Sequence, residues 1–526
     1  MHCTSFFYSL ITQNIFCAYN ERNTESVDHE GDHMNKPRTI ITTDLEVDDM
    51  NSMIHLCLYL NEMNLLGAVY TSSQFHFEGD GIHTLGEVTP HYRTSGNAGL
   101  ERPRKSHGPD PEGKNLKSFR PFPMGWIENL WKNEYTQAYP YLLQHDSSYP
   151  SPEYLLSVTK YGNIEFEGDV RSDTEGSDLI KQYLLDNDSS PLYLQSWGGV
   201  NTIVRALLAI YETYHDTDEW ESVYAKVCGK ARILGVNNGV GQDNSFLDHH
   251  IPELYPDLQC VSPEHYYGVY MASERSQNDI RDMFKAKWML ANIHNGTSAL
   301  MDAYRLYGDG KRVEGEAEVY QYGFTTKLDF GIPGFPVFDF EPYDFIGEGD
   351  SNTYIPLITF GLRGMENPAY GTLLGKLVQE RRNEPAYSWL SGKKEDVNPY
   401  IKAYQEDWAA RAEWCSCDYA HANHAPVITL EKYDADAVPG EVIPLNAEVT
   451  DPDGDEVAIY WEADPAFSNY QGEALLRVWE PWKKKTFFTV PQDAKDGDWF
   501  ALILRAEDRA EKPMTRFAEM IVHVKK

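Results

Sequence analysis

The pattern of apolar and polar residues divides the chain into two regions. From residue 38 to about residue 235, short apolar runs typical of strands alternate with longer stretches whose apolar residues recur every three or four positions, as in helices. This alternation predicts parallel βαβ units in an α/β domain. The stretches that carry the prediction are residues 39–43, 50–60, 64–71, 177–185, 192–197 and 201–214.

A second pattern begins near residue 426, where strand-like runs recur with turn residues between them. These runs are residues 427–430, 442–447, 458–461, 486–490 and 500–504, and the acidic stretch 451–455 is predicted to be a tight turn. The spacing predicts an immunoglobulin-like β-sandwich. We therefore expect a disordered or degenerate leader segment at residues 1–36, an α/β domain at 37–424 and the sandwich at 425–526.

Residues 76–125 interrupt the α/β pattern, because they are rich in Gly, Pro, His and charged residues. A long segment of this composition between regular elements is typical of a functional loop. We interpret it as an insertion over the strand ends and as a candidate lid.

The net charge of the chain limits the classes of partner that it can bind. It has 81 acidic and 46 basic residues, a formal net charge of −35. This charge disfavours nucleic acid and anionic membranes as partners, and no apolar run reaches the ~18 residues of a membrane-spanning helix. Neutral sugars, cationic ligands or a divalent metal are more compatible with it. The seven cysteines form neither a disulfide framework nor a zinc pattern.

Four carboxylates within six residues follow the first predicted strand: Asp44, Glu46, Asp48 and Asp49. The carboxyl end of a strand is where open α/β sheets bind ligands. Like charges so close together repel unless a cation lies among them, and oxygen ligands favour Ca²⁺ or Mg²⁺. The alternative is an acidic helix N-terminus, because Asp and Glu are favoured in the first turn. The residues alone leave both interpretations open.

Residues 42–49, Thr-Thr-Asp-Leu-Glu-Val-Asp-Asp, resemble the amino-terminal Asp-x-Asp-Pro-Gly-x-Asp-Asp signature of the calcium-dependent nucleoside hydrolases. From about residue 37 to its end, the chain resembles more closely their secreted relatives, the nucleoside-hydrolase-like family described as cellulose-binding. Further stretches that carry the resemblance are residues 145–156, 175–180, 197–202, 347–351 and 422–426. The resemblance implies a mostly parallel sheet with flanking helices, a following all-β sandwich and a secreted or periplasmic location.

The resemblance also implies roles for individual residues. Asp44 would be a metal ligand and the base that activates water, Asp49 a bidentate Ca²⁺ ligand, and Asp48 a ligand for a sugar hydroxyl. The main-chain carbonyl of Asn201 and the carboxylate of Asp350 would complete the Ca²⁺ shell. Further sugar contacts are expected from Asp243 and Asn244. Apart from the resemblance, Trp197 beside the Gly198-Gly199 strand end is a candidate for stacking on a sugar ring, and the alternative is a core residue.

Two departures from the nucleoside hydrolase signature bear on the leaving group. Thr42 replaces the first Asp and Leu45-Glu46 replaces Pro-Gly, and Gly349 stands where nucleoside hydrolases often carry a His that helps to protonate the base. A nucleobase is therefore in doubt as the leaving group. Glu348 is the candidate proton donor for a glycosidic oxygen, and the alternative for Glu348 is a solvated loop charge.

Three functions remain open at this point. The leading hypothesis is a Ca²⁺-dependent hydrolase of O- or N-glycosyl bonds, acting on a carbohydrate or nucleoside-like small substrate. The alternatives are a non-catalytic carbohydrate (cellulose)-binding protein and a scaffold in which an ion only holds the strand ends together. A resemblance in fold does not separate them.

Overall fold

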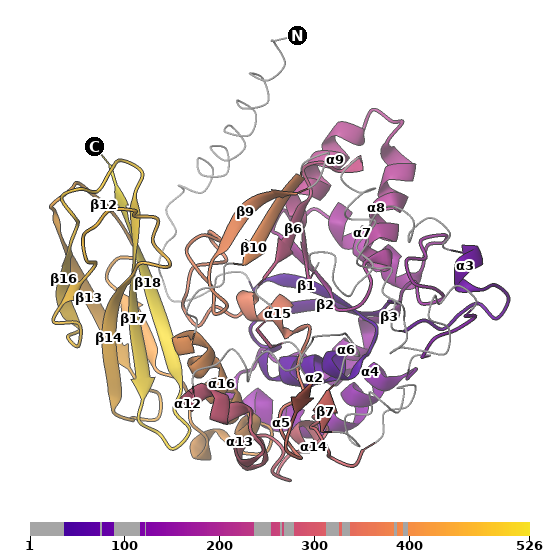
Figure 1. Ribbon diagram of the computed structural model, residues 1–526, viewed down its shortest axis with the longest axis horizontal. Helices are drawn as coiled ribbons and strands as arrows, with labels where there is room; N and C mark the ends of the chain where they lie inside the picture. The colour runs from indigo at the N-terminus through magenta and orange to yellow at the C-terminus, as the bar shows by residue number, and fades with distance from the viewer. Residues whose placement is uncertain are drawn as a thin grey trace. The chain divides into compact units, whose positions relative to one another are not determined.

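The α/β part is built on an eight-stranded sheet with the strand order β3-β2-β1-β4-β5-β6-β10-β9. In this computed structural model all neighbouring strands pair in parallel except β9, which is antiparallel to β10 (Figure 1). The strands are β1 (Arg38–Thr43), β2 (Asn64–Tyr70), β3 (Thr159–Tyr161), β4 (Leu192–Ser196), β5 (Ala231–Leu234), β6 (Gln259–Ser262), β9 (Leu377–Arg382) and β10 (Tyr387–Gly392).

The structure describes most of the chain, with gaps. The described residues are 36–73, 76–88, 116–120, 123–235, 254–263, 266–267, 278–311, 326–328, 337–382, 387–392 and 398–525. Residues from Pro37 to Lys526 belong to one compact unit.

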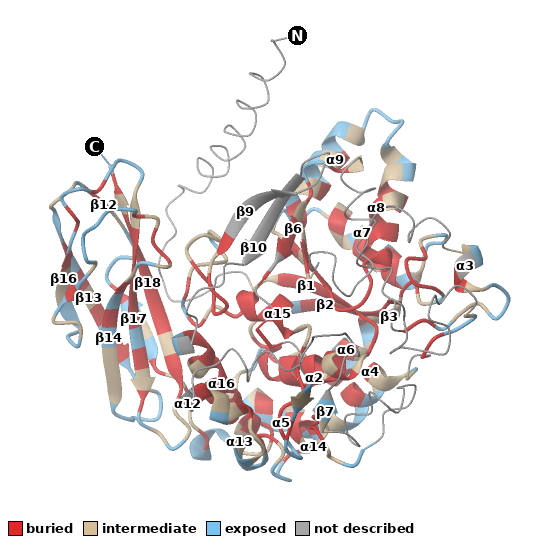
Figure 2. Ribbon diagram, viewed as in Figure 1, coloured by how far each residue is buried: buried red, intermediate tan, exposed pale blue. Residues whose placement is uncertain are grey.

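Strand β1 lies inside the sheet between β2 and β4, and all six of its residues are buried. Because successive side chains point to opposite faces of a strand, Ile40 and Ile41 enter two different cores. Ile40 packs with α7 (Glu175–Leu185), α8 (Asn201–Tyr214) and α9 (Trp220–Lys230), whereas Ile41 shares its cluster with α2 (Val47–Leu56). A sheet covered by helices on both faces explains why β1 has no polar alternation (Figure 2).

The remaining helices and short strands of this part connect the sheet strands or cover the sheet. Helix α2 begins three residues before the predicted stretch 50–60, and the chain continues as η1 (Cys57–Tyr59). The others are α3 (Leu85–Val88), α4 (Trp126–Asn129), η2 (Leu130–Tyr135), α5 (Thr136–His145), α6 (Pro152–Ser157), α12 (Asn278–Arg281), η4 (Asp282–Phe284), α13 (Ala286–Asn292), α14 (Ala299–Asp302), β7 (Lys327–Leu328), β8 (Phe338–Asp339), α15 (Ser351–Tyr354), η7 (Ile355–Leu357), α16 (Asn398–Trp414) and η8 (Tyr419–His421).

The C-terminal part forms two four-stranded sheets, with orders β11-β13-β16-β15 and β12-β18-β17-β14. All pairs are antiparallel except β12 with β18, so the likeness to an immunoglobulin sandwich is loose. Trp461, Phe488 and Phe500 lie in the core between the sheets. The strands are β11 (Val427–Leu430), β12 (Asp434–Ala437), β13 (Val442–Thr450), β14 (Val457–Asp464), β15 (Val478–Trp479), β16 (Lys485–Thr489), β17 (Trp499–Asp508) and β18 (Thr515–Val524).

Buried charges join strand β18 to helix α16. The fully buried Asp407 accepts hydrogen bonds from Arg411 Nε at 2.7 Å, from Arg516 Nη1 at 2.7 Å and from the Tyr59 hydroxyl at 3.1 Å. Its two arginine partners explain why the pKa of Asp407 is lowered although burial opposes this. The α/β part and the sandwich are thus connected by specific hydrogen bonds and ion pairs. The predicted domain boundary near residue 424 remains a prediction.

The two described ends of the insertion at residues 76–125 meet in an antiparallel bridge between Phe77 and Phe119. These two rings pack with Leu85 and Phe166 in a small core of their own. No helix among the described residues has the length and apolar content needed to cross a lipid bilayer.

Candidate metal centre

The candidate centre lies at the carboxyl end of β1, where the chain turns into α2. Leu45 adopts a left-handed conformation with φ of 58°, and its N–H donates to Thr43 Oγ1 at 3.1 Å. Such a conformation is uncommon for a residue other than glycine and costs conformational energy. The turn places Asp44 directly after the strand, and Asp48 and Asp49 in the first turn of the helix.

Three carboxylates converge at this turn. Each of Asp48, Asp49 and Asp350 offers an oxygen atom, and these atoms lie within 4.8 Å of one another. Asp350 is distant in the sequence, and it is the residue that precedes α15. Oxygen ligands at this spacing are compatible with a hard divalent cation, whose bonds to oxygen are about 2.0–2.6 Å long.

Burial and the charges of neighbouring carboxylates both raise the pKa values at the cluster. Burial raises the pKa of Asp49 well above its ordinary value, and the charges of Asp350, Asp44 and Asp48 raise it further. Burial also raises the pKa of Asp350, with Asp48 and Asp44 as the next contributors. Thr43 Oγ1 donates to Asp49 Oδ1 at 2.5 Å, which offsets only part of this. A cation would remove the repulsion.

Asp44 is fully buried, and its two carboxylate oxygens differ in their hydrogen bonding. Oδ2 accepts a hydrogen bond from Ser73 Oγ, whereas Oδ1 has no hydrogen-bond partner among the described residues. Burial raises the pKa of Asp44, while the charges of His76 and Arg120 and the Ser73 bond oppose the increase. A buried carboxylate oxygen without a donor is costly unless a cation or a ligand donor satisfies it.

Two glycines make room for the acidic side chains. A Cβ at Gly349 would lie 2.1 Å from Asp48 Oδ2, and a Cβ at Gly198 would lie 2.9 Å from the Cβ of Asp44. Gly349 therefore allows the Asp48 carboxylate to lie directly against the loop that carries Asp350. This contact gives a physical reason for a glycine where nucleoside hydrolases often carry a His.

Asn201 begins α8 and lies beside the same strand ends. Its side-chain amide donates to Asn163 O at 2.8 Å and to Ser72 Oγ at 2.9 Å, and its Oδ1 accepts from Thr71 Oγ1 at 3.1 Å. These bonds occupy the side chain and fix the start of α8. The expected role of the Asn201 main-chain carbonyl as a metal ligand remains a prediction.

Glu348 is fully buried, which is at odds with a solvated loop charge. Oε1 accepts from the Tyr304 hydroxyl at 2.6 Å and Oε2 from Ser351 Oγ at 2.5 Å, and both oxygens lie 3.0 Å from His55 Nδ1. Because both oxygens are engaged, this arrangement favours an anchor for the Asp350 loop over the expected proton donor.

Trp197 is also fully buried. Its Nε1 donates to Thr353 Oγ1 at 2.8 Å and to Gln195 Oε1 at 3.1 Å, and its ring belongs to the main core cluster. With no exposed ring surface, Trp197 is placed as a core residue and not as a platform for a sugar. The other expected sugar contacts, Asp243 and Asn244, lie outside the described residues.

The structure adds three residues that the sequence did not single out: Ser73, His76 and Arg120. Ser73 bonds to Asp44, and the other two carry charges that lower its pKa. Arg120 Nη2 also lies 3.3 Å from Glu46 Oε1. The only sequence signal for His76 and Arg120 was their place in the candidate lid.

A second acidic group lies in the predicted turn of the sandwich, with Asp451, Asp453 and Asp455 close together. Asp451 Oδ1 accepts from the N–H groups of Asp453 at 2.9 Å and Asp455 at 3.0 Å, and Asp453 Oδ2 accepts from His424 N at 2.7 Å. These hydrogen bonds explain the clustering of the three aspartates as part of a tight turn.

A family model described as "Cellulose-binding Sde182, nucleoside hydrolase-like domain" matches residues 38–377. The chain belongs to the Sde182 family. A second model, the C-terminal domain of cellulose-binding protein Sde0182, matches residues 442–524. Membership of the Sde182 family confirms the predicted resemblance and places the carboxylate cluster in its nucleoside hydrolase-like domain.

One solved structure shares the fold of this chain. A nucleoside hydrolase-related hypothetical protein from Saccharophagus degradans, associated with carbohydrate metabolism, matches with a TM-score of 0.65 and 20% identity over 93% of this chain and 100% of its own. This likeness confirms the predicted fold class. An endo-β-1,4-mannanase from Thermotoga petrophila overlaps at 11% identity over 28% of this chain and 29% of its own, with a TM-score of 0.13 that carries no argument. No curated protein matches the chain significantly.

Proposed function

We propose that this protein is a Ca²⁺-dependent hydrolase of O- or N-glycosyl bonds that acts on a small sugar unit. The observation that carries the proposal is Asp44 Oδ1, a buried carboxylate oxygen without a hydrogen-bond partner among the described residues, beside the converging acids Asp48, Asp49 and Asp350. A purely structural turn would not need an unsatisfied buried base.

Asp48, Asp49 and Asp350 are the residues that would hold Ca²⁺, with Asp44 and the Asn201 carbonyl as the additional ligands that the family resemblance implies. When bound, Ca²⁺ would offset the carboxylate charges and fix oxygen ligands such as water and vicinal sugar hydroxyls. The donor set consists of oxygen atoms, which supports Ca²⁺ over a softer transition metal.

Asp44 is the proposed general base. Ser73 Oγ donates to Oδ2, which orients the carboxylate and leaves Oδ1 to accept a proton from the attacking water. The negative charge of the surrounding aspartates favours the oxocarbenium-like transition state of glycosyl transfer to water. Asp48, which is only partly buried, is the proposed contact for a sugar hydroxyl.

Carbohydrate binding without turnover is the second candidate function. The specific observation in its favour is Glu348, because hydrogen bonds to Tyr304 and Ser351 and the contact with His55 engage both oxygens of the expected proton donor. The cellulose-binding description of the family is compatible with either function. It also supports the secreted or periplasmic location that the resemblance implies.

Turnover assays separate the two candidates. We expect the full-length protein to hydrolyse at least one member of a panel of aryl furanosides, nucleosides and wall oligosaccharides when Ca²⁺ is present, and none in excess chelator. Asp44→Asn should lower kcat by about 10²–10⁴-fold while sugar affinity persists, because a general base contributes about that much. Asp216→Asn is the matched control, since its side chain is 97% exposed.

Two results would contradict the hydrolase proposal. One is full activity in the D44N protein. The other is tight binding of a panel sugar without release of product from the unchanged protein, which would favour the binding function.

A further inference from the structure

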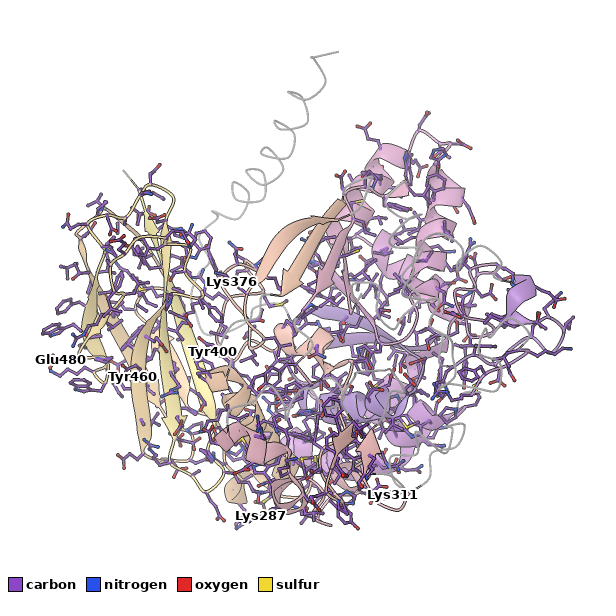
Figure 3. All side chains as sticks on the ribbon, in the orientation of Figure 1. Lys287, Lys311, Lys376, Tyr400, Tyr460 and Glu480 are labelled. Atoms are coloured by element: carbon purple, nitrogen blue, oxygen red, sulfur yellow. The ribbon has the colours of Figure 1, made fainter. Side chains whose placement is uncertain are left out.

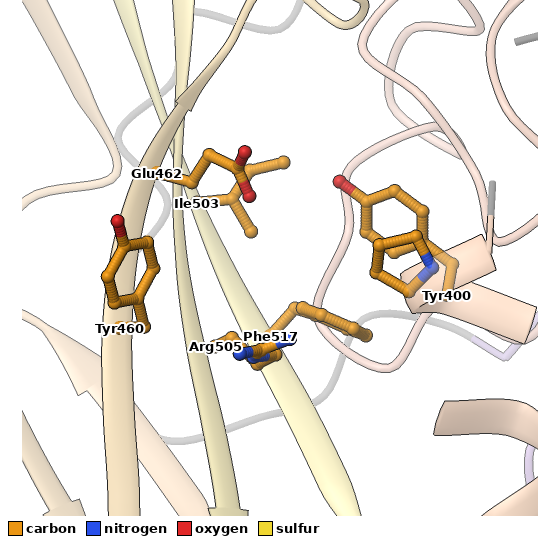
Figure 4. Close-up of a pocket in the computed structure, with 7 residues that line it drawn as sticks. Tyr400, Tyr460, Glu462, Ile503, Arg505 and Phe517 are labelled. Carbon is orange, nitrogen blue, oxygen red and sulfur yellow. The ribbon is translucent and has the colours of Figure 1, made fainter. Parts of the chain in front are cut away.

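Helix α16 contacts the sandwich at both of its ends. At its start, Tyr400 packs against Phe517 of β18 with ring centroids 5.1 Å apart, and its hydroxyl donates to Asp464 Oδ2 at 2.9 Å. Tyr400 and Tyr460, both labelled in Figure 3, line a cavity of about 100 Å³ together with Phe517 and four other residues (Figure 4). Close packing is therefore incomplete at this end of the junction.

The other end of α16 meets the sandwich through two histidines, His145 and His424, which we call the histidine pair. His145 is the last residue of α5, and His424 lies shortly before β11. Trp414, at the end of α16, has its ring centroid 4.7 Å from that of His145 and 5.3 Å from that of His424. His424 is buried and also stacks on Tyr419 at 3.8 Å. The pair thus joins α5, α16 and the start of the sandwich.

Hydrogen-bond contacts link the histidine pair into one chain. His424 Nδ1 lies 3.0 Å from Asp453 Oδ1, in the turn between β13 and β14. His424 Nε2 lies 2.9 Å from His145 Nδ1, and His145 Nε2 lies 2.9 Å from the carbonyl oxygen of Cys417. The chain therefore runs from a carboxylate of the sandwich, through both rings, to a main-chain carbonyl that follows α16.

The acceptors at the two ends determine the number of protons on the pair. A carbonyl oxygen and an ionised carboxylate only accept hydrogen bonds, so the three contacts require three N–H groups. Two neutral imidazoles carry two N–H groups, which leaves one contact without a hydrogen atom. Two imidazolium rings carry four, which sets two N–H groups against each other. One imidazolium and one neutral ring satisfy all three contacts.

The surroundings place the positive charge on His424. Burial lowers the pKa of His145, and the charge of His424 lowers it further, although the Cys417 carbonyl opposes this. His424 lies beside the Asp453 carboxylate, which also accepts its main-chain N–H at 2.7 Å. The stacked ring of Tyr419 offers a π face to a cation. The His424 imidazolium therefore donates to Asp453 and to neutral His145. His145 in turn donates to the Cys417 carbonyl.

Other charged groups near the pair come from α16, from the segment after it and from the sandwich turn. Asp418 and Arg411 have opposite effects on the pKa of the neutral ring. Asp418 Oδ1 also lies 2.6 Å from His421 Nδ1. Asp451 and Asp455 add negative charge in the turn. None of these charges supplies a hydrogen atom to the chain, so the chain itself sets the proton requirement.

We propose that the histidine pair is a pH-dependent switch at the junction between the sandwich and the α/β part. With one proton bound, the chain from Asp453 to Cys417 is complete and holds the acidic turn against the end of α5. Release of that proton to solvent leaves one contact without a hydrogen atom, so the junction loosens. A second proton also breaks the chain, because two N–H groups then face each other. This switch does not depend on the proposed hydrolase function.

The direction of the pH dependence follows from the proton count. Relative to the unfolded chain, whose histidines titrate near about pH 6.5, the folded pair binds its first proton more tightly and its second less tightly. The lowered pKa of His145 is the reason for the weaker second binding. The stabilisation is therefore lost as the pH rises well above about 6.5 and the first proton leaves, and as the pH falls well below it and the second proton binds.

Nitrogen NMR of the full-length protein, prepared with isotope-labelled histidine, counts these protons directly. At about pH 7.5, where an ordinary histidine is mostly neutral, we expect the pair to contain one imidazolium ring and one neutral ring protonated at Nε2. His424→Gln should remove one imidazolium signal. His215→Gln, at the end of α8 with a side chain that is 44% exposed, is the matched control and should keep that signal. If the H424Q protein loses no imidazolium signal, the proposal is overturned.

Asp453→Asn and Asp455→Asn separate the direct contact from the general charge of the turn. Both substitutions remove one negative charge, but Asp453 contacts the His424 ring, whereas Asp455 is exposed in the same turn. We expect D453N to lower the pH at which the imidazolium signal disappears by about one unit or more, and D455N to lower it by much less. Equal shifts in the two proteins would contradict the role given to the Asp453 contact.

Amide hydrogen exchange tests whether the proton controls the junction. In the unchanged protein, exchange in residues 415–424 and 451–455, corrected for the intrinsic effect of pH, should accelerate as the imidazolium signal is lost. In the D453N protein the acceleration should begin at a correspondingly lower pH. Exchange that stays constant through this titration would show that the histidine pair does not act as a switch.

Discussion

His55 and Glu348 connect the two segments that supply the carboxylate cluster. His55 Nδ1 lies 3.0 Å from both carboxylate oxygens of Glu348, and both side chains are completely buried. His55 belongs to α2, which carries Asp48 and Asp49, and Glu348 lies two residues before Asp350. The ring of His55 also stacks on Trp408 at 4.1 Å. The pair thus holds the Asp350 loop against the helix.

Glu348→Gln tests this anchoring role. Replacing the carboxylate by an amide weakens the bonds from Tyr304 and Ser351 and the contact with His55, so we expect the unfolding free energy to fall by about 1–3 kcal/mol. Ca²⁺ affinity should fall as well, because the Asp350 loop is less constrained. Denaturant unfolding and calorimetric Ca²⁺ titration measure the two effects. A large loss of kcat with stability and Ca²⁺ affinity unchanged would instead assign Glu348 as the proton donor.

Gly349→Ala tests the close approach of the loop to Asp48. The backbone of Gly349 is not in the left-handed region, so alanine is acceptable there apart from its Cβ, which would lie 2.1 Å from Asp48 Oδ2. Asp48 must move, and we expect at least about tenfold weaker Ca²⁺ binding, or about 1.4 kcal/mol. Gly229→Ala in α9 is the control, since a Cβ there meets no atom within 4 Å. Equal Ca²⁺ affinity in the two variants would refute the role given to this contact.

Residue patterns alone predicted the part of the candidate site that follows β1, whereas Asp350 was predicted only from the family resemblance. Asp44, Asp48 and Asp49 could be predicted from the sequence because they directly follow the buried run of β1. The strand, the acidic turn and the helix are adjacent in the chain, so their patterns are visible together. Asp350 is about 300 residues away, and only tertiary pairing brings it to α2. No periodicity encodes such a contact.

Trp197 and Ser73 show two further limits of sequence reasoning. Trp197 follows a strand near two glycines, as a site residue would, but the direction of its ring is set by Thr353 and Gln195 in the core. Ser73 lies just after β2, and its role depends on the adjacent position of β1 in the sheet. Side-chain orientation of this kind follows from packing, which the residue pattern does not specify.

The raised pKa of Glu519 on β18 predicts that the stability of the protein depends on pH. Burial raises its pKa from 4.5 to about 8, although Arg363 N donates to Oε2 at 2.8 Å. A raised pKa in the folded state means that the folded protein binds the proton more tightly than the unfolded chain. The stabilisation is therefore complete below about pH 4.5 and is lost as the pH rises to about 8.

Glu519→Gln should remove this dependence, because the amide stays neutral. We expect the E519Q protein and the unchanged protein to have similar melting temperatures near about pH 5, and the variant to be more stable near about pH 8.5. Thermal unfolding at the two pH values measures the difference. A difference that does not grow with pH would show that Glu519 titrates normally.

Ca²⁺ binding by the Asp48, Asp49 and Asp350 cluster is the central claim, and calorimetric titration of the metal-free, full-length protein tests it most directly. The site predicts a Ca²⁺ binding signal that is lost in both Asp49→Ala and Asp350→Ala, because each removes one of three converging carboxylates. Asp455→Asn, in the acidic turn of the sandwich, should keep that signal. Unchanged Ca²⁺ affinity in the D49A and D350A proteins would contradict the account.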